Sequence, residues 1–402
     1  MLRRPDPSME GMSGTQPKRR QMAKESIYLD HNATAPLRPE ARAALYAALD
    51  LTGNPSSVHA HGRKLRDLIE TGRSQVARLA GAETRQVVFT GSATEALTQA
   101  IVGGARTFAA GAVAISAGEH AAVAKAADAT GLPVWTIPVS ADGRVDLDQL
   151  RAALLRADEE NITLLVAVHW VNNETGVVQP IGPISVLVGP TRHTLVIDAV
   201  QALGKLDLDF AASAADMVAI SGHKIGAPAG IGALLVKGHA DTVRLIPGGG
   251  QEQGRRGGTE SAALISAFGA AAAAERMNME AAAALTKRVE DGLRAMAPDV
   301  VIFGESAERV GNVVNFAVPG IRNATAMMAL DLAGLSVSAG SACSSGKVGA
   351  SHVLLAMGVE RDLADCALRV SFGWNSKAED AEAFLAGFET ILARHKRTGK
   401  AA

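Results

Sequence analysis

Short apolar runs recur along the first two thirds of the chain, and their alternation with helical patterns constrains the fold more than any other feature. The runs are VVF from 87, AVAIS from 112, TLLVAVHW from 163, TLVIDA from 194, MVAIS from 217 and IGALLV from 231. Ahead of them, residues 38–50 and 56–81 carry apolar side chains at helical spacing. Because buried strands that alternate with helices form parallel sheets covered on both faces, we expect an α/β fold with a mostly parallel central sheet.

The pattern changes near residue 262. Residues 262–297 read as one or two long helices without a strand signal. The runs VVIFG, GNVVNFAV and LSVSAG then indicate strands, and residues 351–358 and 377–396 indicate helices. A chain of 402 residues is long enough for one large domain and a smaller one, and this part predicts a smaller α/β domain.

Charge and cysteine content exclude several classes of protein. Lys plus Arg number 40 and Asp plus Glu 41, so no overall field would attract the chain to nucleic acid or to an anionic membrane. Polar residues interrupt every apolar stretch well before a bilayer could be crossed. Two cysteines cannot form a disulfide framework, and no secretory signal is visible. We therefore expect a cytoplasmic protein.

The first 26 residues differ from the rest of the chain. They contain Pro, Ser, Gly and the run PKRR without apolar periodicity, which is typical of a disordered tail. Asp6, Glu10 and Glu25 argue against a transit peptide.

A Gly/Ser/Thr loop follows the first expected strand in FTGSATEA. Residues 92–95 match the S-x-x-E capping box that begins a helix. A helix N-terminus offers N–H groups and the positive end of a dipole to an anion. Taken alone, the pattern favours an ordinary capped helix, and it points to a phosphate only together with other ligands.

Two titratable residues stand where expected strands end. Lys224, in the tight connection SGHK, is either a surface lysine or a partly desolvated nucleophilic amine, and spacing alone favours the surface. Asp198 ends TLVIDA, with Gln201 three residues later. It is either a helix cap or an acid that faces a protonated heterocyclic nitrogen.

Together these elements indicate one cofactor. Pyridoxal phosphate requires a lysine for its Schiff base, an acid for its pyridinium nitrogen and donors for its phosphate. Each element is weak alone, but the order helix N-terminus, strand-end Asp and Ser-x-His-Lys forms a specific combination.

Nine segments resemble the NifS/IscS-type cysteine desulfurases, which are pyridoxal-phosphate enzymes of the aspartate-aminotransferase fold (fold type I). They match in order from about residue 27 to the C-terminal region, and they are IYLDHNATAPLRPEA, GNPSSVHAHGR, FTGSATEA, HWVNNETGVVQPI, VIDAVQALGKLDLD, DMVAISGHKIGAPAGIGALLV, GGGQEQGRRGGTES, SAGSACSSG and LRVSFG. The resemblance implies a large cofactor-binding domain of residues 37–281. Residues 27–36 and 282–402 would form a small domain with the catalytic cysteine loop.

The resemblance also implies roles around the cofactor ring. Lys224 is the implied Schiff-base lysine, Asp198 the partner of the pyridine nitrogen and Gln201 a donor to the phenolic oxygen. His120 is implied to stack on the ring and to act in proton transfer. Without the resemblance, His120 would be an ordinary loop histidine.

Further residues are implied for substrate and phosphate. Arg369 would bind the substrate carboxylate with two hydrogen bonds, although its short motif alone also fits a surface salt bridge. Asn173 would lie beside the cofactor and the substrate, and Asn32 would bind the substrate. The implied phosphate ligands are Ala93 through its backbone, Thr94, Ser221, His223 and, from the neighbouring subunit, Thr259. A homodimer with shared sites is therefore implied.

Small residues surround Cys343 in SAGSACSSGKVGAS. The resemblance implies that Cys343 takes sulfur from L-cysteine as a persulfide, leaves L-alanine, and passes the sulfur to an iron–sulfur scaffold or another acceptor protein. Glycines at 340, 346 and 349 give the backbone freedom that a mobile carrier loop needs. Without the resemblance, Cys343 fits a small buried cysteine equally well. Cys366 fits the buried interpretation better.

Departures and alternatives remain. Gln253 stands where the family commonly has Arg, and KVGAS lacks the acidic residue often found in the loop. A selenocysteine lyase, another class-V aminotransferase-family enzyme and a catalytically silent interaction protein are the competing functions. We expect no metal site, because the histidines lack ligand spacing and no cysteine cluster accompanies them; they are His120, His169, His193 and His223.

Overall fold

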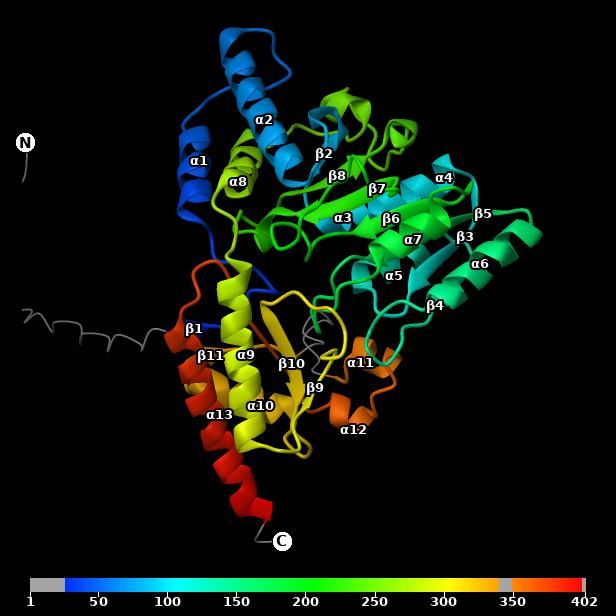
Figure 1. Cartoon of the computed structure of the whole chain (residues 1–402). Coiled ribbons are helices and arrows are strands. Elements are labelled where there is room, and N and C mark those ends of the chain that lie inside the picture. The colour runs from blue at the N-terminus through cyan, green and yellow to red at the C-terminus, as the bar shows by residue number, and fades with distance from the viewer. Residues whose placement is uncertain (1–25, 340–348, 400–402) are drawn as a thin grey trace, which may run out of the picture.

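A seven-stranded sheet forms the centre of the upper half of the molecule in the computed structural model, which describes residues 26–339 and 349–399 (Figure 1). Its strands are, in spatial order, β2 (Val87–Thr90), β8 (Gly232–Val236), β7 (Met217–Ser221), β6 (Thr194–Asp198), β5 (Thr163–His169), β3 (Ala110–Ser116) and β4 (Val134–Ile137). Strands β3 to β7 pair in parallel, whereas β8 is antiparallel to both β7 and β2. The predicted mostly parallel sheet is confirmed.

Alternating side chains of these strands enter two different cores. In β3, Ala112 and Ala114 face one cluster, and Val113 and Ile115 face the other. The first face is covered by α2 (Ala60–Leu79), α6 (Leu147–Glu159), α7 (Ile181–Val188) and α8 (Ala262–Ala273). The second face is covered by α3 (Ala93–Thr98), the π-helical turn η2 (Gln99–Gly103), α4 (Gly104–Thr107) and α5 (Ala121–Asp128). Burial on both faces explains why the strands read as continuous apolar runs.

The lower half of Figure 1 is built on two small sheets. One is antiparallel, in the order β12 (Ala367–Ser371), β10 (Val313–Ala317) and β9 (Val301–Ile302). The other pairs β1 (Ile27–Tyr28) with β11 (Leu335–Ser336) in parallel. Their common core includes residues of α9 (Met279–Met296), α10 (Asn323–Leu332) and α13 (Ala378–Gly399). The first residues described thus pack with the C-terminal part of the chain.

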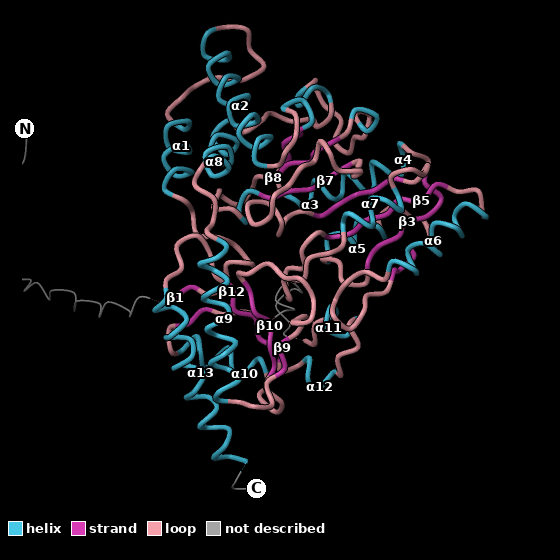
Figure 2. The backbone as a smooth tube through the Cα atoms, viewed as in Figure 1, coloured by secondary structure: helices cyan, strands magenta, loops and turns pink. Residues whose placement is uncertain are grey.

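The remaining short elements connect these parts along the trace of Figure 2. They are α1 (Pro39–Leu49), η1 (Thr84–Gln86), η3 (Gly222–Lys224), η4 (Gly238–Ala240), η5 (Gln251–Gly254), α11 (His352–Ala356) and α12 (Arg361–Ala364). Residues 262–297 form two helices, α8 and α9, which confirms the two-helix interpretation of that segment. The strand β4 was not among the expected apolar runs.

Some expectations concern residues outside the described ranges. The predicted disordered tail covers residues 1–26, of which only Ser26 is described. Cys343 lies in the range 340–348, which is also outside the described residues. Cys366 is described and is a buried free cysteine, as expected.

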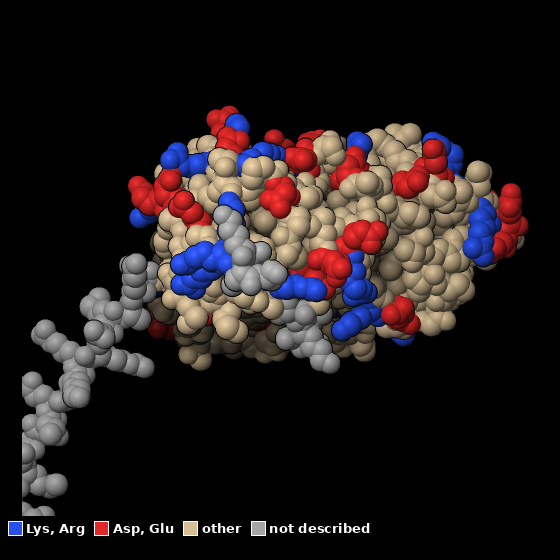
Figure 3. All heavy atoms as spheres, turned by 90° about the horizontal axis from the view of Figure 1, so that it is seen from below, with Lys and Arg blue, Asp and Glu red and all other residues tan. Residues whose placement is uncertain are grey.

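The surface charges are mixed, as the nearly equal numbers of basic and acidic residues lead one to expect. On the face shown in Figure 3, basic and acidic side chains are interspersed. Among the described helices, none has both the length and the apolar character that a bilayer crossing requires.

Candidate active site

A cavity of about 420 Å³ opens beside the ends of the central strands. It is lined by eleven residues that the sequence had singled out: Asn32, Ala93, Thr94, His120, Asn173, Asp198, Gln201, Ser221, His223, Lys224 and Arg369. Seven of them stand on or just after the carboxyl ends of parallel strands, namely His120, Asn173, Asp198, Gln201, Ser221, His223 and Lys224. Because the carboxyl ends of parallel strands meet at one edge, the fold brings these distant segments together.

Asp198 is the last residue of β6 and has only 8% of its surface exposed. Its Oδ1 accepts a hydrogen bond from the Val200 N–H at 2.9 Å. Burial raises the pKa of Asp198 from 3.8 to about 6, against the opposing effects of that hydrogen bond and of the nearby His169 and Lys224 charges. A carboxyl in this position is stabilised as an anion by any cation placed before it in the cavity.

A second buried acid lies behind the same edge. The neighbouring-strand partner of Asp198 is His169, whose Nδ1 is 2.7 Å from Glu119 Oε1. Burial lowers the pKa of His169, but the charge and hydrogen bond of Glu119 outweigh it, so the net pKa is raised. The Glu119 carboxylate and, more weakly, Asp198 thus favour the charged form of His169. Sequence reasoning had considered His169 only as a metal ligand and had missed Glu119.

Lys224 follows β7 in the tight turn η3, and its amine faces the loop after β1. The Nζ atom donates to the main-chain oxygens of Asn32 at 2.6 Å and Ala33 at 2.8 Å. Gln201 Nε2 donates to the same Asn32 oxygen at 2.8 Å. The surface interpretation of Lys224 is wrong, because its amine lines the cavity and binds buried backbone.

Another end of the cavity is formed by the start of α3 and the end of β7. Ser92 caps the helix, since its Oγ accepts from the Glu95 N–H at 3.1 Å. The first N–H groups of a helix have no partner within the helix, so Ala93 and Thr94 can present theirs to an anion. Glu95 is held away from the cavity by Arg256, with Nε to Oε1 at 2.7 Å.

Two histidines of the cavity are held in the neutral form. Burial and the Lys224 charge lower the pKa of His223 to about 4, and its Nδ1 lies 3.2 Å from Thr34 Oγ1. Burial and the same charge also lower the pKa of His120. His120 caps α5 with its Nδ1, which accepts from the Ala122 N–H at 3.2 Å, so its ring has a fixed orientation.

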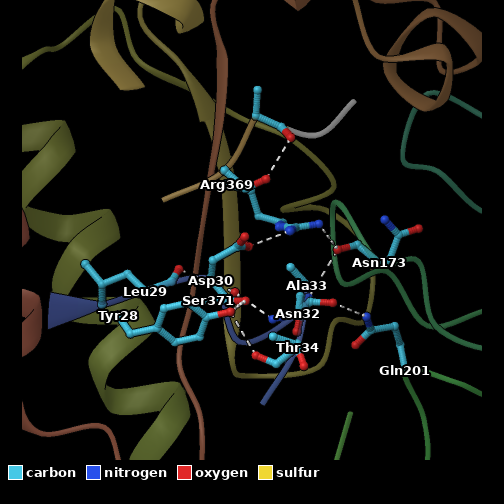
Figure 4. A network of polar contacts seen from close by, with 12 residues as sticks. Tyr28, Leu29, Asp30, Asn32, Ala33, Thr34, Asn173, Gln201, Arg369 and Ser371 are labelled. Atoms are coloured by element: carbon cyan, nitrogen blue, oxygen red, sulfur yellow. Dashed lines mark hydrogen bonds and ion pairs between the residues drawn. The ribbon is translucent and has the colours of Figure 1, made fainter. Parts of the chain in front are cut away.

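Arg369 reaches the cavity from β12. Its guanidinium donates to Asp30 Oδ1 at 2.6 Å and to the main-chain oxygen of Asn173 at 3.0 Å, as Figure 4 shows. Its side chain is 3% exposed, and the buried Nε has no hydrogen-bond partner. A guanidinium that lines the cavity can donate two hydrogen bonds to a carboxylate. The surface salt-bridge interpretation of Arg369 is thereby excluded.

Two predicted site residues are not brought into this cavity. Thr259 is exposed and lines a separate pocket with Arg256 and Gly91, so within one chain it does not reach the cavity. Cys343 lies outside the described residues. Lys205, which the sequence reasoning missed, donates to Gln201 Oε1 at 2.6 Å; its only signal was its place four residues after Gln201.

The side chains present fit pyridoxal phosphate. An amine, a buried acid and a helix start with neighbouring Ser221 and His223 supply one group for each polar part of that molecule. The described residues contain no group of three His, Cys, Asp or Glu that could hold a metal ion.

Comparisons with known proteins agree with the geometry. The aminotransferase class-V family matches residues 27–384. An IscS-like cysteine desulfurase of Mycobacterium tuberculosis is 37% identical over 391 residues, which cover 93% of this chain and 98% of the relative. A cysteine desulfurase of Trichormus azollae is 40% identical over 342 residues, which cover 83% of this chain and 84% of the relative.

A solved structure shows the same fold. The NifS-like protein from Rickettsia africae superimposes with a TM-score of 0.82 at 31% identity, over 91% of this chain and 99% of that chain. The fold expected from the resemblance, fold type I of pyridoxal-phosphate enzymes, is confirmed. The chain therefore belongs to the class-V aminotransferase family and, within it, to the cysteine desulfurases of the NifS/IscS type.

Proposed function

We propose that this chain converts L-cysteine to L-alanine and carries the released sulfur as a persulfide on Cys343. The observation that carries this proposal is the convergence of Lys224, Asp198 and Arg369 on one cavity. These three come from segments far apart in the sequence and supply an amine, an acid and a carboxylate clamp. The relatives that match over most of this chain are named cysteine desulfurases, which supports the same activity.

The cofactor of this family is pyridoxal phosphate. When bound, it supplies an electron sink that makes the Cβ–Sγ bond of cysteine cleavable. Lys224 would hold its aldehyde carbon, Asp198 would face its ring nitrogen, and Gln201 would donate to its phenolic oxygen. Its phosphate would be held by Ala93, Thr94, Ser221 and His223.

Other side chains of the cavity would bind the substrate and transfer protons. Arg369 binds the substrate carboxylate, and Asn32 and Asn173 border it. Asp198, as an anion, would stabilise a proton on the ring nitrogen that faces it. The Lys224 amine is the proton carrier within the cavity, and the neutral His120 can assist because its orientation is fixed by its helix cap.

Sulfur transfer requires a protein thiolate. The thiolate of Cys343 attacks the substrate sulfur, the electron pair of the broken C–S bond stays with carbon, and that carbon is protonated. L-cysteine and a thiol thus become L-alanine and a persulfide. This assignment of Cys343 rests on the sequence.

Partners follow from the same proposal. We place the chain in a homodimer in which Thr259 contributes to the phosphate site of the neighbouring subunit, and the exposure of Thr259 supports this. The persulfide would pass to an iron–sulfur scaffold or another sulfur acceptor in the cytoplasm. Residues 37–281 would act as the cofactor-binding domain, with residues 27–36 and 282–402 as the small domain.

The test measures two products together. Cofactor-loaded protein is incubated with L-cysteine and a thiol reductant, and alanine and sulfide are quantified. Equal amounts of the two, both lost in Lys224→Ala, are expected. Alanine without sulfide or persulfide, or pyruvate in place of alanine, would contradict the proposed reaction.

A further inference from the structure

Lys205 lies in the turn after β6, beside the cavity, and the function proposed above gives it no task. Its ammonium donates to Gln201 Oε1 at 2.6 Å and to Asn32 Oδ1 at 2.9 Å. Both partners are neutral amides. Burial and the charge of Lys224 lower the pKa of Lys205 well below its usual value. A lysine in such costly surroundings needs an explanation beyond packing.

The first consequence concerns the Gln201 amide. The oxygen and nitrogen ends of an amide have nearly the same shape, so only their hydrogen-bond partners decide which end faces which way. Because an ammonium can only donate, Lys205 binds the Oε1 end. The Nε2 end is then directed toward the Asn32 main-chain oxygen, 2.8 Å away (Figure 4). Lys205 thus keeps the donor end of Gln201 on the side that borders the cavity.

The second consequence concerns Asn32. Its Oδ1 accepts from Lys205 and also from Asn312 Nδ2, the latter at 3.1 Å. Its Nδ2 is therefore left to donate to the main-chain oxygen of Asn173, at 3.2 Å. The main-chain oxygen of the same Asn32 accepts from Lys224 at 2.6 Å. Lys205 thus fixes the residue to which the reactive amine is bound.

The third consequence is electrostatic. Several elements carry a titratable group that interacts with the charge of Lys224. These groups are His120 before α5, Asp198 on β6, Lys205 in the following turn, and His223 in η3. The two histidines are neutral near pH 7, and Asp198 favours a charged amine. The charges of Lys224 and Arg369 both act against the charged form of Lys205.

We propose that Lys205 is a positioning residue of this site, which fixes the orientation of the Gln201 and Asn32 amides through its two hydrogen bonds. The inference deepens the function proposed above and rests on it for the identity of the cofactor. Substitutions that keep or remove the donor atoms of Lys205 test it.

The experiment follows the absorbance of the bound cofactor across pH without substrate. It compares the wild type with Lys205→Met, which removes charge and donors, and with Lys205→Arg, which keeps both. The matched control is Lys237→Met, because Lys237 donates only to the main-chain oxygens of Phe210 and Ala211, outside the cavity. Lys205→Gln, which keeps a donor without the charge, replaces the Met variant if that variant does not fold.

The proposal predicts that Lys205→Met shifts the midpoint of the absorbance titration by about one pH unit, because the donor end of Gln201 is no longer held toward the cofactor. Lys205→Arg and Lys237→Met should titrate like the wild type. An unchanged midpoint in Lys205→Met, or an equal shift in the Met and Arg variants, would overturn the proposal. Since no turnover is needed, a wild type that binds the cofactor but forms no alanine would overturn the proposed function alone.

Discussion

The Lys224 amine donates a 2.6 Å hydrogen bond to the main-chain oxygen of Asn32. This contact joins the turn after β7 to the loop after β1. In the sequence, most strands of the large sheet lie between these two segments. The Asn32 N–H in turn donates a hydrogen bond to Ser371 Oγ of β12 at 2.9 Å. Asn32 therefore connects the reactive lysine to the strand that supplies Arg369.

Replacement of Lys224 tests this amine. We expect Lys224→Ala to lower the rate of alanine formation by at least about 100-fold, since a positioned acid–base group contributes roughly that much or more. Covalent capture of the cofactor should also be lost, which reduction with borohydride followed by mass measurement would detect. Retained covalent capture in the variant would assign the lysine role to another residue.

Asp198 gives the protein without cofactor a defined pH dependence. Its folded pKa of about 6 lies above its usual 3.8, so the folded state binds the proton more tightly. The cost of the buried anion is fully present above about pH 6, falls as the pH drops from about 6 toward 3.8, and is absent below 3.8. Two pKa units correspond to about 3 kcal/mol.

Asp198→Asn should therefore gain unfolding free energy relative to the wild type, by up to about 3 kcal/mol, as the pH rises from 4 to 7. Urea denaturation of both proteins at several pH values measures this difference. The same variant should lose most activity, because the neutral amide cannot keep the cofactor nitrogen protonated. A stability difference independent of pH would contradict the assigned burial cost.

Arg369 should govern substrate binding more than turnover. Arg369→Lys removes two-point binding, and hydrogen bonds to charged groups contribute about 1.5 to 3 kcal/mol. We expect KM for L-cysteine to rise about 10- to 100-fold, with a smaller change in kcat. Steady-state kinetics measure both, and Arg322→Lys, on an exposed arginine paired with Asp365, is the control. A fall in kcat with unchanged KM would contradict this role.

The buried pair of Arg73 and Glu252 should stabilise the fold. Arg73 NH1 and NH2 bind the two oxygens of Glu252 at 2.6 and 2.9 Å, and Glu252 Oε2 also accepts from the Phe89 N–H at 2.8 Å. Glu252→Gln removes the buried countercharge of Arg73 and leaves only the half-exposed Glu70, 3.2 Å from Nε. We expect a loss of about 3 kcal/mol in unfolding free energy, whereas Glu83→Gln at an exposed pair should change it by less than about 1 kcal/mol. Equal effects of the two substitutions would contradict this.

Much of the fold was predictable because buried parallel strands give continuous apolar runs. Strand β4 was missed for a physical reason: it lies at the sheet edge, and its Thr136 is exposed, so VWTI lacks a fully apolar pattern. The antiparallel direction of β8 could not be read from IGALLV, because apolar content does not encode strand direction. The tight SGHK connection was the one feature that indicated it, because a short connection joins neighbouring strands in opposite directions.

The site residues could be predicted where they stand in a motif that the family shares, and less well elsewhere. Lys224 and Arg369 alone resembled surface residues, and only their place in the fold shows their burial. Lys205 and Glu119 act through partners distant in the sequence, Asn32 and His169, so no local pattern could reveal them. The location of Thr259 depends on a second chain, and its role stays a prediction.

The position of the transferred sulfur tests the central claim most directly. Cofactor-loaded protein is incubated with L-cysteine without reductant, its thiols and persulfides are alkylated, and the peptides that contain Cys343 and Cys366 are weighed. We predict that the Cys343 peptide gains the mass of one sulfur atom and that the peptide of Cys366, which is buried, does not. Sulfur on Cys366, or alanine formation with no added sulfur on Cys343, would contradict the account.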